Sequence, residues 1–325
     1  MLQAFAYARP STLAEAVRLA GRDGARLHAG GTDLLGCLRD HVLAAETVVS
    51  LSSLADLRGI APARDGGLRI GALATIAEVA AHPVIRERYA ALAEAASQVA
   101  SPQLRNQGTL GGNLCQKPRC WYYRGDFHCL RKGGEMCYAA EGENQAHALF
   151  GAERCFYVHP SDTAPALVAL GASVRLVGPA GPRALLLDRF FVPPSTDPQR
   201  ETVLEPGEIL TDVVLPPPGA GLRSSYRKVR ARAVWDFALA GVALAARMEG
   251  DVVREARVVL SGVAPVPWRH PGAEAALAGK PLDATTIAAA ARAATAGAEP
   301  LAHNAYKVEL LRGLLTDELE RLARR

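Results

Sequence analysis

The chain has 325 residues, of which 49% are hydrophobic and 22% are charged, and its formal net charge at pH 7 is +4. This length allows two or three domains, and so small a charge without a basic, aromatic-rich patch argues against a nucleic-acid partner. No apolar run approaches the roughly 20 residues that a membrane span needs, and residues 1–10 lack a signal-peptide pattern. We therefore expect a cytoplasmic protein, with the periplasm as the alternative if a partner carries an export signal.

The first fifty residues carry the pattern of a small unit of strands and helices. Thr12 and Glu15 form a capping box at the start of a helix. A short strand then leads into Gly30 and Gly31, and another helix follows. Because neither glycine has a Cβ, backbone N–H groups at this turn can approach an anion closely. A plain strand-to-helix turn is the alternative interpretation.

The middle of the chain alternates strands and helices. Its pattern predicts strands at 48–51, 68–73, 172–177 and 208–215, and helices after Thr75, over 84–99 and over 164–170. The run Pro216-Pro217-Pro218-Gly219 indicates a boundary.

The last third is predicted to be a separate α+β module. Strands are expected at 225–234, 237–248 and 252–261, and helices at 273–278, 284–296 and 305–324. In the first of these strands, period-two alternation places Tyr226 on one face with three cations, Lys228, Arg230 and Arg232. Such a face lies against solvent or against an anionic ligand.

Residues 115–155 form a long irregular segment with five of the six cysteines. Connections of this length usually have a function or are disordered, and the aromatic residues here argue against disorder. The cysteines are widely spaced, unlike the close cysteine pairs of structural zinc sites. The missing export signal disfavours disulfides. We interpret the segment as a metal-cluster loop; zinc, disulfides and unrelated packed thiols remain alternatives. Cys37 is expected to be a buried small side chain.

Several motifs in register carry a resemblance to a known family. The longest are Ala29-Gly30-Gly31-Thr32-Asp33-Leu34, Arg105-Asn106-Gln107-Gly108-Thr109-Leu110-Gly111-Gly112-Asn113 and Ser161-Asp162-Thr163-Ala164-Pro165-Ala166-Leu167. Together with shorter motifs at 208–210, 226–229 and 260–265, they resemble the FAD-binding subunit of the xanthine dehydrogenase (molybdenum hydroxylase) family over essentially the whole chain. The resemblance implies an α+β fold. A two-subdomain FAD-binding (PCMH-type) fold would occupy residues 1–57 and 58–218, and a C-terminal α+β domain like that of CO dehydrogenase flavoproteins would occupy residues 219–325.

The resemblance also implies which residues hold FAD. The first glycine turn would wrap the pyrophosphate, and the second would hold the diphosphate and ribityl region. Asp162 would accept hydrogen bonds from ligand hydroxyls, Leu210 would bond through its backbone, and Lys228 would lie beside the isoalloxazine, where a cation stabilises a reduced flavin. The complete set is Leu27, His28, Ala29, Gly30, Gly31, Thr32, Asp33, Leu34, Thr109, Gly111, Gly112, Asn113, Asp162, Leu210 and Lys228.

The cysteine segment is similar to a loop of 4-hydroxybenzoyl-CoA reductase β subunits and of the flavin subunits of bacterial aldehyde oxidoreductases, where it holds a [4Fe–4S] cluster. That resemblance implies four thiolate ligands, and we choose Cys120, Cys129, Cys137 and Cys155. Cys115 directly follows the second glycine turn and is expected to pack there, but it is the alternative ligand. Five cations are expected to offset the cluster's negative charge: Lys117, Arg119, Arg124, Arg131 and Lys132.

The implied function is electron transfer within a heterotrimeric molybdenum hydroxylase, by resemblance an aldehyde oxidoreductase. Substrate would be oxidised at a molybdenum cofactor on a large subunit. Electrons would reach this chain from the [2Fe–2S] clusters of a small subunit and leave to an external acceptor. No side chain needs to act as a general acid or base, so no catalytic residue is predicted. The alternatives are a stand-alone flavin-dependent oxidase and a zinc-stabilised interaction module.

Overall fold

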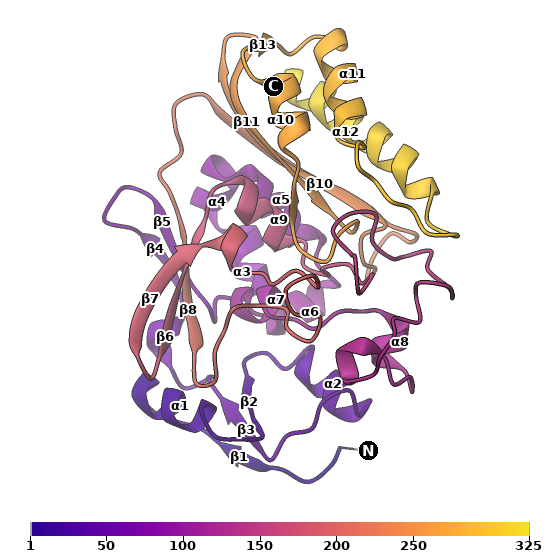
Figure 1. The fold of residues 1–325 in the computed structure, drawn as a ribbon. Coiled ribbons are helices and arrows are strands. Elements are labelled where there is room, and N and C mark those ends of the chain that lie inside the picture. The colour runs from indigo at the N-terminus through magenta and orange to yellow at the C-terminus, as the bar shows by residue number, and fades with distance from the viewer. Residues whose placement is uncertain (1, 325) are drawn as a thin grey trace.

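The computed structural model describes residues 2–324 and arranges them around three sheets (Figure 1). The first sheet is parallel, has the order β1-β3-β2, and consists of β1 (Ala6–Ala8), β2 (Ala25–His28) and β3 (Thr47–Ser50). Helix α1 (Leu13–Ala20) begins after Thr12, whose hydroxyl accepts a hydrogen bond from the amide of Glu15. Helix α2 (Leu34–Arg39) follows the Gly30-Gly31 turn, so the predicted strand–turn–helix unit is confirmed.

The second sheet is antiparallel, with the order β4-β5-β8-β6-β7. Its strands are β4 (Ile60–Pro62), β5 (Leu68–Gly71), β6 (Ser173–Gly178), β7 (Gly181–Leu186) and β8 (Ile209–Leu215). The helices of this region are α3 (Ile76–Ala81), α4 (Pro83–Arg88), α5 (Ala90–Gln98), α6 (Pro102–Gln107), α7 (Leu110–Leu114) and α9 (Thr163–Ala169). Fully buried residues such as Ile70, Leu92, Leu167 and Val213 join these strands and helices in one hydrophobic core.

The helix predicted over 84–99 is interrupted at Tyr89, between α4 and α5. The Tyr89 side chain is buried, and its hydroxyl donates to the carbonyl of Pro216 at 2.8 Å. Tyr89 leaves the helical conformation, with φ −136° and ψ 52°. A long-range hydrogen bond, which the alanine-rich pattern does not reveal, accompanies this break.

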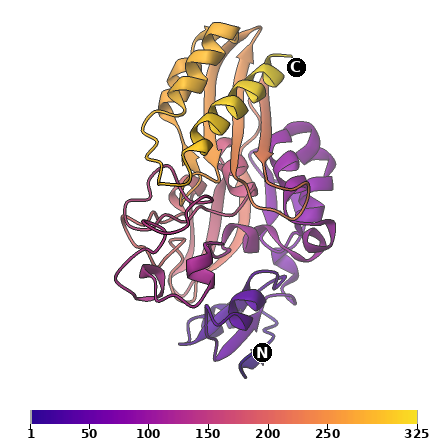
Figure 2. The ribbon, with the colours of Figure 1, turned by 90° about the vertical axis from the view of Figure 1, so that its right-hand side faces the viewer.

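The third sheet has the order β12-β11-β10-β9, with β13 added to β11. Its strands are β9 (Leu222–Val229), β10 (Ala240–Glu249), β11 (Val252–Ser261), β12 (Trp268–Arg269) and β13 (Lys280–Pro281). Helices α10 (Pro271–Leu277), α11 (Ala284–Ala293) and α12 (Tyr306–Ala323) cover one face of this sheet (Figure 2). The α+β fold predicted for the chain is confirmed.

One detail of the predicted third module is wrong. Strand β9 ends at Val229, where its pairing with β10 ends at Ala240, so Arg230 and Arg232 lie beyond the strand and not on its face. Lys228 does lie in the strand, but it is buried and does not face solvent.

The cysteine loop, residues 115–155, contains little regular structure. Within it the structure has α8 (Trp121–Arg124) and the 3₁₀ turn η2 (Leu130–Lys132); the other 3₁₀ turns are η1 (Ala55–Leu57) and η3 (Leu187–Arg189). In Figure 1, α8 lies beside α2 of the N-terminal unit. Among the helices of residues 2–324, none is long and apolar enough to cross a membrane.

Candidate cofactor-binding site

A pocket of 1150 Å³ collects segments that are far apart in the sequence. Its volume exceeds the roughly 300–1,000 Å³ of ordinary small-molecule sites, so it has room for an extended cofactor. His28 and Lys228 lie outside its lining. The other predicted cofactor residues all line it: Leu27, Ala29, Gly30, Gly31, Thr32, Asp33, Leu34, Thr109, Gly111, Gly112, Asn113, Asp162 and Leu210.

The first glycine turn is shaped by contact with the second. A Cβ on Gly30 would lie 1.8 Å from the carbonyl oxygen of Gln107, and Gly31 has a φ of +71°, which favours glycine. Within residues 2–324, the amides of Gly31, Thr32 and Asp33 donate to no backbone carbonyl. Free amides in a pocket suit an anionic group such as a phosphate, so this turn fits the pyrophosphate of FAD.

The backbone of the second glycine turn, residues 109–113, shapes the pocket but offers few free amide donors. The hydroxyl of Thr109 accepts a hydrogen bond from the amide of Gly112 at 3.2 Å, and the amide of Gly111 donates to Ala72. A Cβ on Gly111 would lie 2.8 Å from the Cβ of Ala72. This turn therefore brings backbone close to the pocket, while its own amides are already satisfied.

Asn113 connects the second turn to the start of α9. Its Oδ1 accepts hydrogen bonds from the hydroxyls of Ser161 at 2.5 Å and Thr163 at 2.7 Å. This bridge holds Asp162, between those two residues, at the pocket wall.

Asp162 uses both carboxylate oxygens inside the protein. Tyr226 donates to Oδ1 at 2.7 Å, and the Lys228 ammonium donates to Oδ2 at 2.8 Å. Burial raises the pKa of Asp162, and the nearby Lys228 and Tyr226 oppose that rise. Lys228 thus lies behind Asp162, and its predicted contact with a flavin stays a prediction. The sequence signal for this trio was the shared face of Tyr226 and Lys228; their partner could not be identified from it.

The cysteines of the loop divide into two groups. Cys120 and Cys129 pack in one small hydrophobic cluster with Cys37 and Tyr123, and the neighbouring Cys155 lowers the pKa of Cys137. Cys115 packs instead against the main hydrophobic core, and burial raises its pKa to about 12. Within residues 2–324, no three His, Cys, Asp or Glu side chains gather as a bound metal ion requires. The geometry by itself therefore does not support the predicted [4Fe–4S] site.

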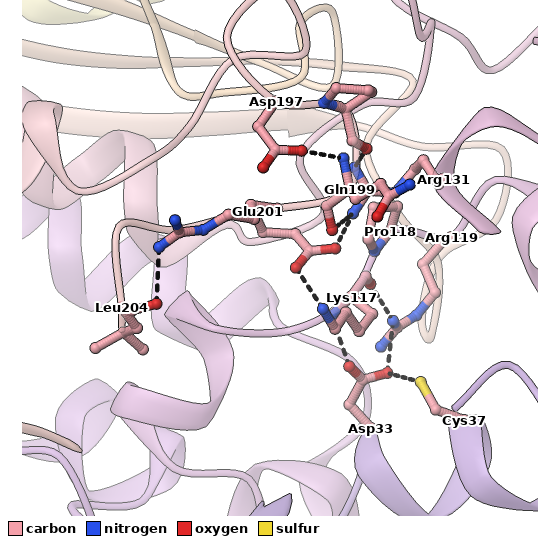
Figure 3. A network of polar contacts seen from close by, with 12 residues as sticks. Asp33, Cys37, Lys117, Pro118, Arg119, Arg131, Asp197, Gln199, Glu201 and Leu204 are labelled. Atoms are coloured by element: carbon pink, nitrogen blue, oxygen red, sulfur yellow. Dashed lines mark hydrogen bonds and ion pairs between the residues drawn. The ribbon is translucent and has the colours of Figure 1, made fainter. Parts of the chain in front are cut away.

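An ion-pair network ties the cysteine loop to the rest of the protein (Figure 3). Arg119 and Arg124 lie 2.7 and 2.8 Å from the carboxylate of Asp33. Lys117 and Arg131 both pair with Glu201. Most of the loop cations that we expected to offset a cluster's negative charge therefore form ion pairs with two carboxylates. Such pairing is expected, because buried charges need a partner. Lys132 donates to the carbonyl of Gly125.

The N-terminal end of α12 holds the other side of the loop. Lys307 is buried, and its ammonium donates to the carbonyls of His147 and Gly262 at 3.0 and 2.9 Å. Asn304 donates to the carbonyl of His147 as well. The ring of His147 in turn lies 3.3 Å from the sulfur of Cys120. No local pattern in the sequence indicates these anchors.

Comparison with known proteins agrees with the geometry of the pocket. Residues 3–218 match the FAD binding domain in molybdopterin dehydrogenase, and residues 224–322 match the CO dehydrogenase flavoprotein C-terminal domain. The aldehyde oxidoreductase FAD-binding subunit PaoB of Escherichia coli (strain K12) is 40% identical over 324 residues, covering 98% of both chains. The carbon monoxide dehydrogenase medium chain of Hydrogenophaga pseudoflava is 31% identical over 301 residues, covering 91% of this chain and 88% of that one.

The fold agrees as well. A solved structure of carbon monoxide dehydrogenase from Hydrogenophaga pseudoflava, lacking the Mo-pyranopterin moiety, matches with a TM-score of 0.77 at 28% identity. The match covers 100% of this chain and 97% of that one. Since the first family description alone spans well over half of the residues, this chain belongs to the family of FAD-binding subunits of molybdopterin dehydrogenases, which are oxidoreductases.

Proposed function

We propose that this chain is the electron-transferring FAD subunit of a molybdenum hydroxylase that oxidises an aldehyde. The observation that carries the proposal is the pocket, where a turn with free amides faces a second turn of closely packed glycines. The 40% identity to PaoB over nearly the whole chain supports the aldehyde as the substrate class. In this role the subunit receives electrons from a partner's [2Fe–2S] clusters and delivers them to an external acceptor.

Each part of the pocket has a separate task in holding FAD, whose flavin supplies the redox chemistry when bound. The segment from Leu27 to Leu34 binds the pyrophosphate through its amides, and the turn from Thr109 to Asn113 forms the opposite wall. Asp162 and the backbone of Leu210 orient the ligand from the remaining side. The charge of Lys228 acts through Asp162, because that carboxylate separates it from the pocket.

We also propose that Cys120, Cys129, Cys137 and Cys155 hold a [4Fe–4S] cluster. Thiolates are the donors that such a cluster takes. The shared packing of Cys120 and Cys129, and the different surroundings of Cys115, support this choice of ligands. Holding the cluster requires the loop to draw the thiols closer together than they lie in this structure.

The proposed complex has three kinds of subunit. A large subunit carries the molybdenum cofactor, a small subunit carries the [2Fe–2S] clusters, and this chain is the medium subunit. The names of relatives as a medium chain and as an FAD-binding subunit support this arrangement. We propose domain boundaries after residues 57 and 218, since the second sheet starts with β4 at Ile60 and the third with β9 at Leu222.

The test is an absorption spectrum of the purified chain, with measured flavin, iron and sulfide per chain. After anaerobic reconstitution we expect about one FAD and four iron atoms per chain, the stoichiometry of one cubane cluster. A chain that stays colourless in the presence of FAD would overturn the flavin assignment. Bound zinc without iron would overturn the cluster assignment and leave the flavin assignment standing.

A further inference from the structure

We propose that Asp33 is a positioning residue that couples the nucleotide turn to the cysteine loop, so that filling either site raises the affinity of the other. This inference rests on the proposed function, because it concerns the two cofactors named there. It adds a dependence between them that neither site shows alone.

The backbone and the side chain of Asp33 serve different sites. Its backbone belongs to the glycine turn, where Asp33 is the residue before α2. A side chain at this position usually caps its own helix, but Asp33 makes no such hydrogen bond. Its carboxylate points instead to the cysteine loop, as Figure 3 shows.

The carboxylate gathers three donors from one short stretch of that loop. Oδ2 accepts the amide of Lys117 at 2.7 Å, and Oδ1 lies 2.7 Å from Arg119 and 2.8 Å from Arg124. Burial alone would raise the pKa of Asp33, yet the two guanidinium groups lower it, so the carboxylate is ionised at neutral pH. Removing its charge would leave two partly buried cations without their partner, which is strongly destabilising for the contact.

The same stretch carries a proposed ligand. Cys120 lies between Arg119 and Arg124 in the sequence. Arg124 also donates to the carbonyl of Pro118 at 2.8 Å, and Arg119 donates to the carbonyl of Lys117 at 2.6 Å. These bonds make residues 117–124 a compact unit, so the position of Cys120 depends on the attachment of the unit to Asp33.

The contact between Asp33 and residues 117–124 forms part of the wall of the nucleotide pocket. Asp33, Lys117, Arg119 and Arg124 all line the pocket. A loop fixed by its metal therefore completes the pocket wall before FAD arrives, and bound FAD fixes Asp33 and thereby the loop. Coupling between two binding equilibria is reciprocal by thermodynamic necessity.

Glu201 provides the matched control. It also pairs with loop cations, Lys117 and Arg131, and is buried, but it does not line the pocket. Glu201→Gln and Asp33→Asn each remove one negative charge. Glu201→Gln loosens the cysteine loop without touching the nucleotide turn, whereas Asp33→Asn breaks the contact between the turn and the loop.

The experiment titrates FAD into iron-free and iron-reconstituted full-length chain and follows flavin fluorescence. For the unmodified chain we expect FAD to bind about tenfold more tightly when iron is present, within the usual range of coupling between sites. For Asp33→Asn we expect the two affinities to be equal within twofold. For Glu201→Gln we expect the tenfold ratio to remain.

A second measurement needs no iron and reads the loop directly. FAD should slow proteolytic cleavage within residues 117–136 of the unmodified chain and of Glu201→Gln, but not of Asp33→Asn. If Asp33→Asn does not fold, Arg124→Gln breaks the same contact from the loop side and should also reduce the affinity ratio.

The outcomes separate this inference from the proposed function. Equal FAD affinities in the unmodified chain with and without iron would overturn the coupling while leaving both cofactors in place. If Asp33→Asn lowers the FAD affinity by the same factor in the iron-free and iron-reconstituted chains, Asp33 contacts FAD directly. That result would also overturn the coupling. No FAD binding by the unmodified chain would instead remove the proposed function.

Discussion

The nucleotide pocket and the cysteine loop are neighbours, yet different forces hold them in place. The pocket turns are set by backbone packing, with Gly30 against Gln107 and Gly111 against Ala72. The loop has little regular structure and is held by charged and polar side chains from outside it, among them Asp33, Glu201, Asn304 and Lys307.

This difference determines how each region fails. Packed backbone tolerates displacements of only tenths of an ångström, so the pocket is sensitive to added volume. Ion pairs and hydrogen bonds from remote segments tolerate small shifts but not the loss of one partner. Substitutions that add atoms should therefore damage the pocket, and substitutions that remove charges or ligands should damage the loop.

The largest expected effect is the loss of iron from the loop. Cys137→Ser should abolish iron retention after reconstitution, because it removes one of four proposed thiolate ligands. Cys115→Ser should retain iron, since Cys115 packs against the main hydrophobic core at the end of the second glycine turn. Iron and sulfide per chain measure both variants. Retained iron in Cys137→Ser together with lost iron in Cys115→Ser would exchange the ligand assignments.

The buried ion pair of Asp162 and Lys228 stands at the pocket wall, and breaking it tests whether charge also matters on the pocket side. Lys228→Met leaves the Asp162 carboxylate buried without its cation, which should lower the free energy of unfolding by about 3–5 kcal/mol. Tyr226→Phe removes one hydrogen bond to the same carboxylate and should cost only about 1 kcal/mol. Urea denaturation of the FAD-free chain measures both. Unchanged stability of Lys228→Met would mean that this lysine matters only when flavin is bound.

Added volume should break the first glycine turn. Gly30→Ala places a methyl group where the Gln107 carbonyl lies, 1.8 Å away, and the backbone must move apart. We expect at least a hundredfold weaker FAD binding, about 2.7 kcal/mol, measured by fluorescence titration. Gly313→Ala is the control, because nothing lies within 4 Å of its new methyl group in α12. That variant should bind FAD normally, and a similar loss there would contradict the steric explanation.

The features that the sequence predicted well are those in which neighbouring residues determine the structure. The Thr12 and Thr75 caps depend on residues within a few positions, and both are present. The Gly30-Gly31 turn was visible as a glycine pair, although its contact with Gln107 was not. The strand over 225–234 was predicted to end too late, because β9 covers Leu222–Val229 and its end is set by pairing with β10, more than ten residues away.

The anchors of the cysteine loop could not be predicted for a similar reason. Asp33 meets Arg124 across 91 positions, and Lys307 meets His147 across 160. No periodicity connects such pairs, so their contacts follow only from the folded arrangement of the three sheets. The sequence showed the cysteines themselves. It did not show which charged side chains hold the cysteine loop in place.

A further prediction concerns Lys307, a loop anchor whose ammonium donates to carbonyls and not to a carboxylate. Burial lowers the pKa of Lys307 to about 7, whereas lysine in an unfolded chain has a pKa of about 10.4. Between these two values the unfolded chain binds more protons than the folded one. This lysine's contribution to the free energy of unfolding therefore rises with pH from about 7 to 10.

Lys307→Met removes this pH dependence. Between pH 7 and 9, the unmodified chain should gain about 2 kcal/mol relative to the variant, since one pH unit corresponds to about 1.4 kcal/mol per proton. Urea denaturation at both pH values measures the difference, and the exposed Lys280→Met serves as the control, for which no such difference is expected. Parallel stability curves for Lys307→Met and the unmodified chain would mean that water reaches this ammonium and the end of α12 holds the cysteine loop less firmly than its hydrogen bonds indicate.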